Sequence, residues 1–172
     1  MNMLEENIDE QDSSEFKHQN NIEYFGFEED FVEANIRCIP MIVRYKMDIT
    51  GIKLKLSEWS KFNLKERMEL AKMATENQED IDKYFNYLAN LIRHYTSQEA
   101  SLLEVEQCPY WRVTNAVPDL IQQEAKNHGW TVELDRWRRL TKLQRFALTK
   151  LARPGHENKN FPNAVREFEL IS

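Results

Sequence analysis

The sequence predicts a mainly α fold, a single domain with an internal duplication, and three observations carry this prediction. The 172 residues include only four glycines and are 41% hydrophobic, which suits helices joined by few tight turns. Residues 39–74 align without gaps to residues 117–152. Each segment holds one short stretch of alternating apolar and polar side chains, which is typical of a half-buried strand. We therefore expect helices packed on a small sheet.

The internal repeat keeps a constant offset of 78 residues. A repeat constrains the whole fold, so it is weighed before single motifs. Two copies are too few for a solenoid, and we interpret them as an ancient duplication inside one domain. Eight of the 36 aligned positions are identical: Pro40/Pro118, Gly51/Gly129, Leu56/Leu134, Trp59/Trp137, Arg67/Arg145, Leu70/Leu148, Lys72/Lys150 and Ala74/Ala152.

Each copy opens with a predicted helix between a proline and a glycine. Pro40 and Pro118 suit the first helical position, where a missing N–H costs nothing. Gly51 and Gly129 suit the end of the helix, where the chain turns left-handed and only glycine has no steric cost.

An alternating stretch follows each glycine, over 52–56 and 130–134. Lone strands leave backbone groups unpaired, so we expect the two copies to pair as a two-stranded antiparallel ribbon around a pseudo-twofold. Helices must cover the apolar face of this ribbon, because an isolated hairpin is marginal. Ser57 and Asp135 are the predicted N-caps of two short helices, one in each copy, which carry the equivalent tryptophans Trp59 and Trp137.

A second cap closes each copy. Asn63 and Thr141 are predicted to cap helices over 64–74 and 142–152. In the first copy, Glu66 stands three residues after the cap and completes a capping box. Each copy therefore reads helix, strand, short helix, helix.

The rest of the chain frames these copies. Residues 1–22 are acidic and poor in apolar side chains, which predicts a disordered tail before a globular domain over 23–172. Helices are expected over about 28–37 and 79–95, the second being the longest, with a further helix from Pro162. Residues 96–116 form a long connector.

Charge and composition exclude several classes. The chain has a net charge of −6, with −5 over residues 1–22 and +4 over residues 109–172. Such asymmetry suggests charged partners, whereas an acidic chain without a nucleic-acid motif argues against DNA or RNA. No apolar run is long enough for a membrane span. No targeting segment is evident, and two cysteines make no disulfide framework, so we expect a cytoplasmic protein.

One polar loop near the C-terminus is the first candidate site. It presents cations, a carboxylate, an imidazole and amides within eight residues, which suits recognition of a partner's polar surface. The alternative is that these groups cap the preceding helix and fasten the last one. The loop consists of Arg153, Pro154, Gly155, His156, Glu157, Asn158, Lys159 and Asn160.

A basic cluster around Trp137 is the second candidate. It suits contact with an acidic protein, or it is a solvated helix face behind a buried tryptophan. Its members are Arg136, Arg138, Arg139 and Lys142.

No catalytic or metal site is predicted. His156 and Glu157 lack further ligands nearby in sequence, and Cys38 and Cys108 are too few for an iron–sulfur cluster. Glycine-rich phosphate loops, nucleophile elbows and zinc patterns are all missing. We therefore expect no enzyme activity and no cofactor.

Four further stretches belong together: residues 27–33 (FEEDFVE), 37–41 (RCIPM), 51–62, and 143–148 (LQRFAL) running into 153–161. They resemble the nitrate reductase associated protein family, which is found mainly in cyanobacteria. The resemblance covers residues 24–170 and implies an accessory protein that assimilatory nitrate reductase needs for activity. It brings no catalytic residue with it.

Two functions remain open on this basis. The first is a non-enzymatic accessory factor that binds nitrate reductase and supports either maturation of its metal centres or its electron supply from ferredoxin. The second is a small-ligand-binding regulator of nitrogen assimilation, with its pocket between the two copies. Changing Arg153 and His156 together is expected to weaken partner binding without unfolding the chain.

Overall fold

The fold is mainly helical with one small two-stranded antiparallel sheet, as the sequence predicts. The computed structural model describes residues 22–28 and 38–172. The predicted disordered tail, except Ile22, and most of the predicted helix over 28–37 therefore lie outside the described residues. The chain divides into two compact units, residues 1–105 and 106–172. We describe each unit by itself, and the single domain over 23–172 stays a prediction.

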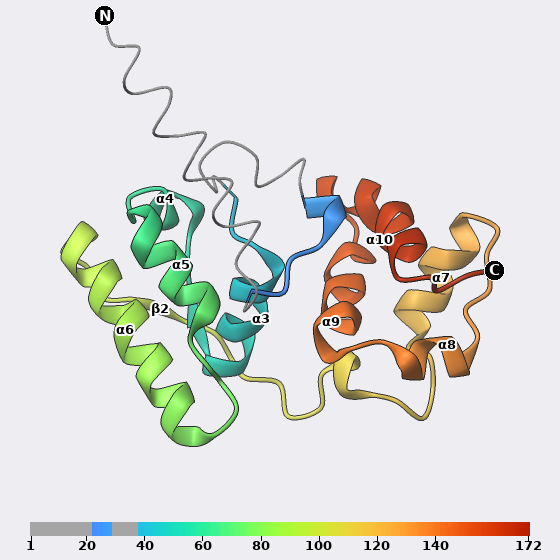
Figure 1. Cartoon of the computed structure of the whole chain (residues 1–172), viewed down its shortest axis with the longest axis horizontal. Coiled ribbons are helices and arrows are strands. Elements are labelled where there is room, and N and C mark those ends of the chain that lie inside the picture. Colours follow the sequence, from blue (N-terminus) through green and yellow to red (C-terminus); the bar gives the residue numbers. More distant parts are fainter. Residues whose placement is uncertain (1–21, 29–37) are drawn as a thin grey trace, which may run out of the picture. The chain divides into compact units, whose positions relative to one another are not determined.

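The longest helix of unit 1 is α6 (Gln78–Thr96). Helix α6 runs one residue beyond the predicted range at each end, and it packs against α3, α4 and β1. Its N-cap is Asn77, whose side chain accepts a hydrogen bond from the backbone N–H of Asp80. The elements of unit 1 (Figure 1) are η1 (Gly26–Glu28), α3 (Met41–Thr50), β1 (Ile52–Lys53), α4 (Leu56–Trp59), α5 (Leu64–Lys72), α6 (Gln78–Thr96) and β2 (Ser101–Leu102).

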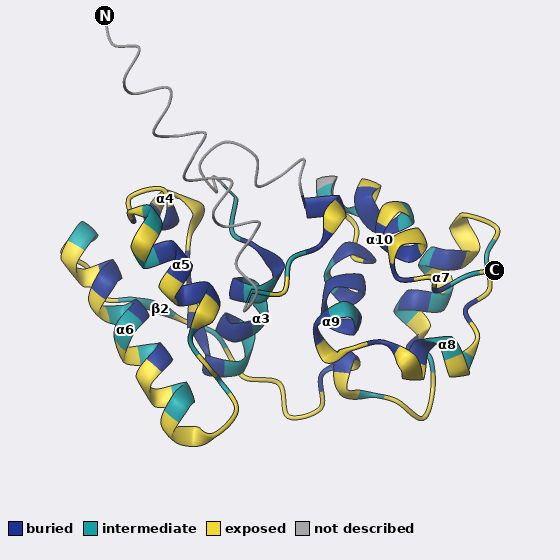
Figure 2. Ribbon diagram, viewed as in Figure 1, coloured by how far each residue is buried: buried dark blue, intermediate teal, exposed yellow. Residues whose placement is uncertain are grey.

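The core of unit 1 forms where the apolar face of α6 meets the first copy of the repeat. Tyr84, Leu88 and Ile92 are fully buried, and they join Trp59 and Val43 in one cluster. Figure 2 shows α6 alternating between buried and exposed residues along its length. This is the amphipathic pattern that 3.6-residue periodicity produces.

Glu28 fastens the first described segment to helix α3. Its buried carboxylate accepts a 2.7 Å hydrogen bond from the N–H of Met41, the first residue of α3, and a 3.1 Å bond from the N–H of Phe25. A negative charge is stabilised at the N-terminus of a helix, where backbone N–H groups are unpaired. Glu28 thus supplies the hydrogen-bond acceptor at the N-terminus of α3 that the side chain of the N-cap residue, Pro40, lacks.

Unit 2 is organised around helix α9. This helix packs against η2, α7, η3 and α10, and most of its residues are buried. The elements of unit 2 are η2 (Tyr110–Arg112), α7 (Asp119–Asn127), α8 (Leu134–Arg139), α9 (Lys142–Leu151), η3 (His156–Asn160) and α10 (Phe161–Glu167).

The two aligned segments carry helices in the same order, α3–α4–α5 and α7–α8–α9. Gly51 and Gly129 adopt φ values of 75° and 76°, so both glycines are left-handed as predicted. The equivalent tryptophans, Trp59 and Trp137, are fully buried. The duplication itself remains an interpretation of these likenesses.

The second caps are confirmed in both segments. The Asn63 side chain and the Thr141 side chain each accept a hydrogen bond from the N–H three residues later. In turn, the side chains of Glu66 and Gln144 each accept a hydrogen bond from the backbone N–H of the cap residue.

The predicted first caps, Ser57 and Asp135, are wrong by two residues. The N-caps are Lys55 for α4 and Glu133 for α8. In α4 the reason is Glu58, whose carboxylate accepts a 2.7 Å hydrogen bond from the N–H of Lys55. This bond satisfies the earlier N–H, so the helix begins before Ser57.

The predicted pairing of the two copies is also wrong. Strand β1 pairs antiparallel with β2 from the connector, with Ile52 opposite Leu102. Residues 130–133 of the second segment belong to no strand. There, the Gln122 side chain takes the place of a strand partner. Its amide accepts a 3.2 Å hydrogen bond from the N–H of Val132 and donates a 2.7 Å bond to the carbonyl oxygen of the same residue.

Candidate interaction surface

The polar loop over 153–160 links the end of α9 to α10, and a glycine shapes it. Gly155 has φ 152° and ψ 178°, a conformation essentially restricted to glycine. The turn at Pro154 and Gly155 sends the chain into η3, which packs on both α9 and α10. The predicted helix from Pro162 is α10, which begins at Phe161.

The loop splits into an outward part and an inward part. Arg153, Pro154, Gly155 and Lys159 are exposed, whereas Glu157 and Asn158 are partly buried. The Asn158 amide donates a 3.0 Å hydrogen bond to the carbonyl oxygen of Leu151 and so caps α9. Asn160 is buried, and the side chain of His156 lies outside the part described. The capping interpretation therefore applies to Asn158, and partner binding by the exposed residues of the loop stays a prediction.

The members of the basic cluster, which lie on α8 and at the start of α9, also differ in their contacts. Arg136 fastens the C-terminal segment, because its Nη1 donates to the carbonyl oxygens of Glu169, at 2.8 Å, and of Ile171, at 3.1 Å. Arg138 is half exposed, and its Nε donates a 3.0 Å bond to the carbonyl oxygen of Thr114. The side chains of Arg139 and Lys142 are exposed and make no hydrogen bond or ion pair with any described residue. These last two cations are therefore the members most accessible to a partner.

The connector is fixed to unit 2 over residues 111–114, which composition alone did not indicate. Arg145 donates a 2.8 Å hydrogen bond from Nε to the carbonyl oxygen of Trp111. The indole N–H of Trp137 donates a 2.8 Å bond to the carbonyl oxygen of Val113. Together with the bond from Arg138, three side chains of α8 and α9 hold this segment in place.

The short helix η2 consequently presents two side chains that the sequence analysis missed. Tyr110 is 50% exposed. Arg112 is exposed, and its guanidinium carbon lies 4.9 Å from the centre of the Trp111 ring. Pro109, the N-cap of η2, is the sequence signal that a fixed turn begins here.

The arginines at equivalent positions of the two copies have the same structural role. Arg67 donates from Nε and Nη2 to the carbonyl oxygens of Trp59 and Ser60, at 3.3 and 3.1 Å. Arg145 donates from Nη1 to the carbonyl oxygen of Leu140 at 2.5 Å. In both segments the guanidinium thus caps the chain after the short helix.

A second polar cluster of unit 2 surrounds His128, the C-cap of α7. Its ring stacks on Trp130, with 5.0 Å between ring centres, and on Phe161, with 6.2 Å. Its Nε2 lies 3.2 Å from a carboxylate oxygen of Glu124. These contacts join the end of α7 to the start of α10, so we assign them a packing role.

Metal-ligating side chains do not gather in the part of the chain that the structure describes, where no group of three or more His, Cys, Asp or Glu could hold an ion. Cys38 is partly buried and Cys108 is exposed. Within residues 22–28 and 38–172, no helix is long and apolar enough to cross a membrane.

Fold and surface together define a small, mainly helical protein with exposed cations on a C-terminal loop and at the junction of α8 and α9. The chain belongs to the conserved nitrate reductase-associated protein family, whose model matches residues 24–168. Searches of curated proteins and of solved structures found no match. The resemblance noted from the sequence is therefore confirmed at the level of the family.

Proposed function

We propose that this protein is a non-enzymatic accessory factor that binds assimilatory nitrate reductase in the cytoplasm and supports its maturation or activity. Membership of the nitrate reductase-associated family carries this proposal, because the match spans nearly all of the residues after the acidic N-terminal segment. The accessible cations of unit 2 and the outward part of the 153–160 loop support it, since both offer groups for a protein partner.

The decisive experiment is a pull-down with the tagged full chain against purified nitrate reductase, in apo and cofactor-loaded forms, at low and moderate salt. Preferential capture of the apo form is the expected result for a maturation factor. Equal capture of both forms would indicate a subunit-like role instead. Capture of neither form would overturn the proposal.

Electron delivery from ferredoxin is the competing form of this function, and a third component separates the two. Purified ferredoxin is added to each pull-down. A maturation factor is expected to capture apo nitrate reductase equally well with and without ferredoxin. A ternary complex that forms only with loaded enzyme and ferredoxin would favour electron delivery.

A further inference from the structure

The junction of α8 and α9, together with η2, forms one exposed basic face of unit 2. We call it the η2–α8–α9 face and define it by Tyr110, Arg112, Arg138, Arg139 and Lys142. Two hydrogen bonds bring its parts together. Arg138 of α8 reaches the carbonyl oxygen of Thr114, and Arg145, one turn along α9 from Lys142, reaches that of Trp111.

Two arginines of this face are already ordered before any partner arrives. The Arg112 guanidinium lies over the ring of Trp111, which is 6% exposed and whose carbonyl group is hydrogen-bonded. The Arg138 guanidinium is held by Thr114 and by Asp135, whose carboxylate oxygen lies 3.5 Å from Nη1. Because ordering a long side chain opposes association, such preorganisation favours binding.

The composition of the face matches that of energetically important contacts between proteins. Arginine and tyrosine are enriched among residues that dominate binding energy. A guanidinium also presents several N–H groups in a plane, which suits paired hydrogen bonds to a carboxylate.

The charge of the face selects the kind of partner. The face carries four cations. The acidic side chain that the structure pairs with this group is Asp135, which lies near Arg138. Arg139 and Lys142 have no ionic partner within the described ranges, 22–28 and 38–172. Unit 2 as a whole has 11 basic and 8 acidic side chains, although the complete chain is acidic. An acidic protein surface would satisfy these cations and be steered toward them.

We propose that the η2–α8–α9 face is the surface on which an acidic patch of nitrate reductase docks. This inference rests on the proposed function and adds the contact chemistry, which is arginine and lysine against clustered carboxylates. It also revises the basic cluster found in the sequence, since Arg136 leaves it for a structural role and Tyr110 and Arg112 join it.

The test is a charge reversal in the full chain, Arg139→Glu with Lys142→Glu, measured as the Kd for purified nitrate reductase at several salt concentrations. Both residues are exposed, so the melting temperature is expected to stay that of the wild type. The Kd is expected to rise at least about tenfold, because like charges then meet across the interface. The salt dependence of the remaining binding is expected to flatten.

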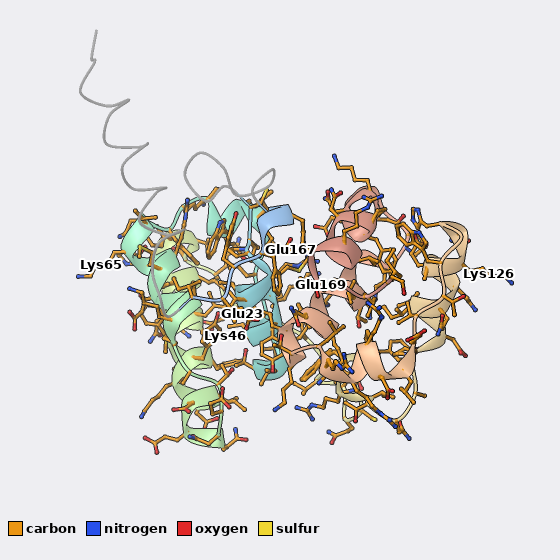
Figure 3. All side chains as sticks on the ribbon, turned by 45° about the vertical axis from the view of Figure 1, so that its right-hand side comes forward. Glu23, Lys46, Lys65, Lys126, Glu167 and Glu169 are labelled. Atoms are coloured by element: carbon orange, nitrogen blue, oxygen red, sulfur yellow. The ribbon has the colours of Figure 1, made fainter. Side chains whose placement is uncertain are left out.

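A matched control changes the net charge by the same amount elsewhere. Lys65 of α5 and Lys126 of α7 are exposed and extend clear of the ribbon (Figure 3). Lys65→Glu with Lys126→Glu is expected to leave the Kd within about threefold of the wild type, because neither lysine belongs to the η2–α8–α9 face although the net charge changes by the same amount. An equal loss in both double variants would overturn the assignment of the face.

The outcomes separate the two proposals. If the wild-type chain binds nitrate reductase and the Arg139→Glu/Lys142→Glu variant binds it with the same Kd, the face is not the docking surface. The proposed function would then still stand. No binding of the wild-type chain would overturn both. A DNA duplex is the second probe. Duplex binding that the charge reversal abolishes, with nitrate reductase binding unchanged, would assign the face to nucleic acid instead.

Discussion

Lys46 shows how one buried charge shapes the stability of unit 1. It lies on α3 with its side chain buried, and its Nζ donates a 2.5 Å hydrogen bond to the carbonyl oxygen of Ala71. Burial lowers the pKa of Lys46 from 10.5 to about 8, and the Glu76 carboxylate opposes this shift. The position of Lys46 is marked in Figure 3.

This lowered pKa predicts a pH dependence with a definite sign. Below pH 8 the folded and unfolded chains both hold the proton. Between pH 8 and 10.5 the unfolded chain keeps a proton that the folded chain has lost, so the free energy of unfolding rises with pH by up to about 1.4 kcal/mol per unit. Lys46→Met is expected to remove this rise. Urea unfolding of both proteins from pH 7 to 10 measures it, and a constant difference between the two curves would contradict the assignment.

At the residue scale, the sequence located the cations of the candidate site but not their partners. Arg136 and Lys142 read alike as members of one basic cluster. In the structure, Arg136 bonds to carbonyl oxygens 33 and 35 residues away, whereas Lys142 faces solvent. Partners so distant in sequence follow from tertiary packing, which local composition does not encode.

At the scale of the elements, the helices and the presence of a small two-stranded sheet were predictable, whereas the partner of strand β1 was not. Caps and glycines act within a few residues, so the start of α5 at Asn63 and the end of α3 at Gly51 could be read directly. A strand partner must come from elsewhere in the chain. The connector supplied it for β1, while Gln122 served Val132 in the second segment. The equivalent position in the first segment is Arg44, which has only donors.

The two left-handed glycines offer a matched test of these element ends. A Cβ at Gly129 would meet nothing within 4 Å, so Gly129→Ala is expected to lose only the conformational term, about 1–2 kcal/mol. A Cβ at Gly51 would lie 2.9 Å from Cγ2 of Val105 and 3.2 Å from the carbonyl oxygen of Leu103. Gly51→Ala is therefore expected to lose clearly more, as measured by urea unfolding. Equal losses in the free energy of unfolding would contradict this prediction, because they would show that the segment after β2 moves away from the added Cβ without a measurable energetic cost.

Arg145 is expected to be the main fastening between η2 and α9. It is 7% exposed, and hydrogen bonds from charged groups contribute about 1.5–3 kcal/mol each. Arg145→Ala is therefore expected to destabilise the protein by about 3 kcal/mol and to speed amide hydrogen exchange over residues 110–114. The control is Arg138→Ala, which removes a half-exposed guanidinium from the same segment. It is expected to cost less than about 1 kcal/mol, and a reversed order would contradict the fastening role.

At the scale of the whole molecule, charge is unevenly distributed along the chain. The net −6 includes −5 over residues 1–22, outside the matched family region, which begins at residue 24. Unit 2 is basic by contrast, with 11 basic and 8 acidic side chains. The matched region therefore includes most of this basic unit, in which four exposed cations lie near the two ends of α9: Arg139, Lys142, Arg153 and Lys159.

This arrangement makes the last prediction a double-mutant cycle between the two ends of α9. Arg139 and Lys142 stand at its start, and Arg153 and Lys159 follow its end. Ten helical residues span about 15 Å, which exceeds the separation of about 7–10 Å within which substitutions usually interact. One partner surface of about 800 Å² can cover both ends.

The cycle combines Arg139→Glu/Lys142→Glu with Arg153→Ala/Lys159→Ala and measures binding to nitrate reductase. If one partner contacts both ends, each pair weakens binding, and the losses add within about 0.5 kcal/mol. A loop pair without effect, alone or in combination, would show that the 153–160 loop serves the fold through the cap of Asn158 on α9. The η2–α8–α9 face would then be the sole contact of the two.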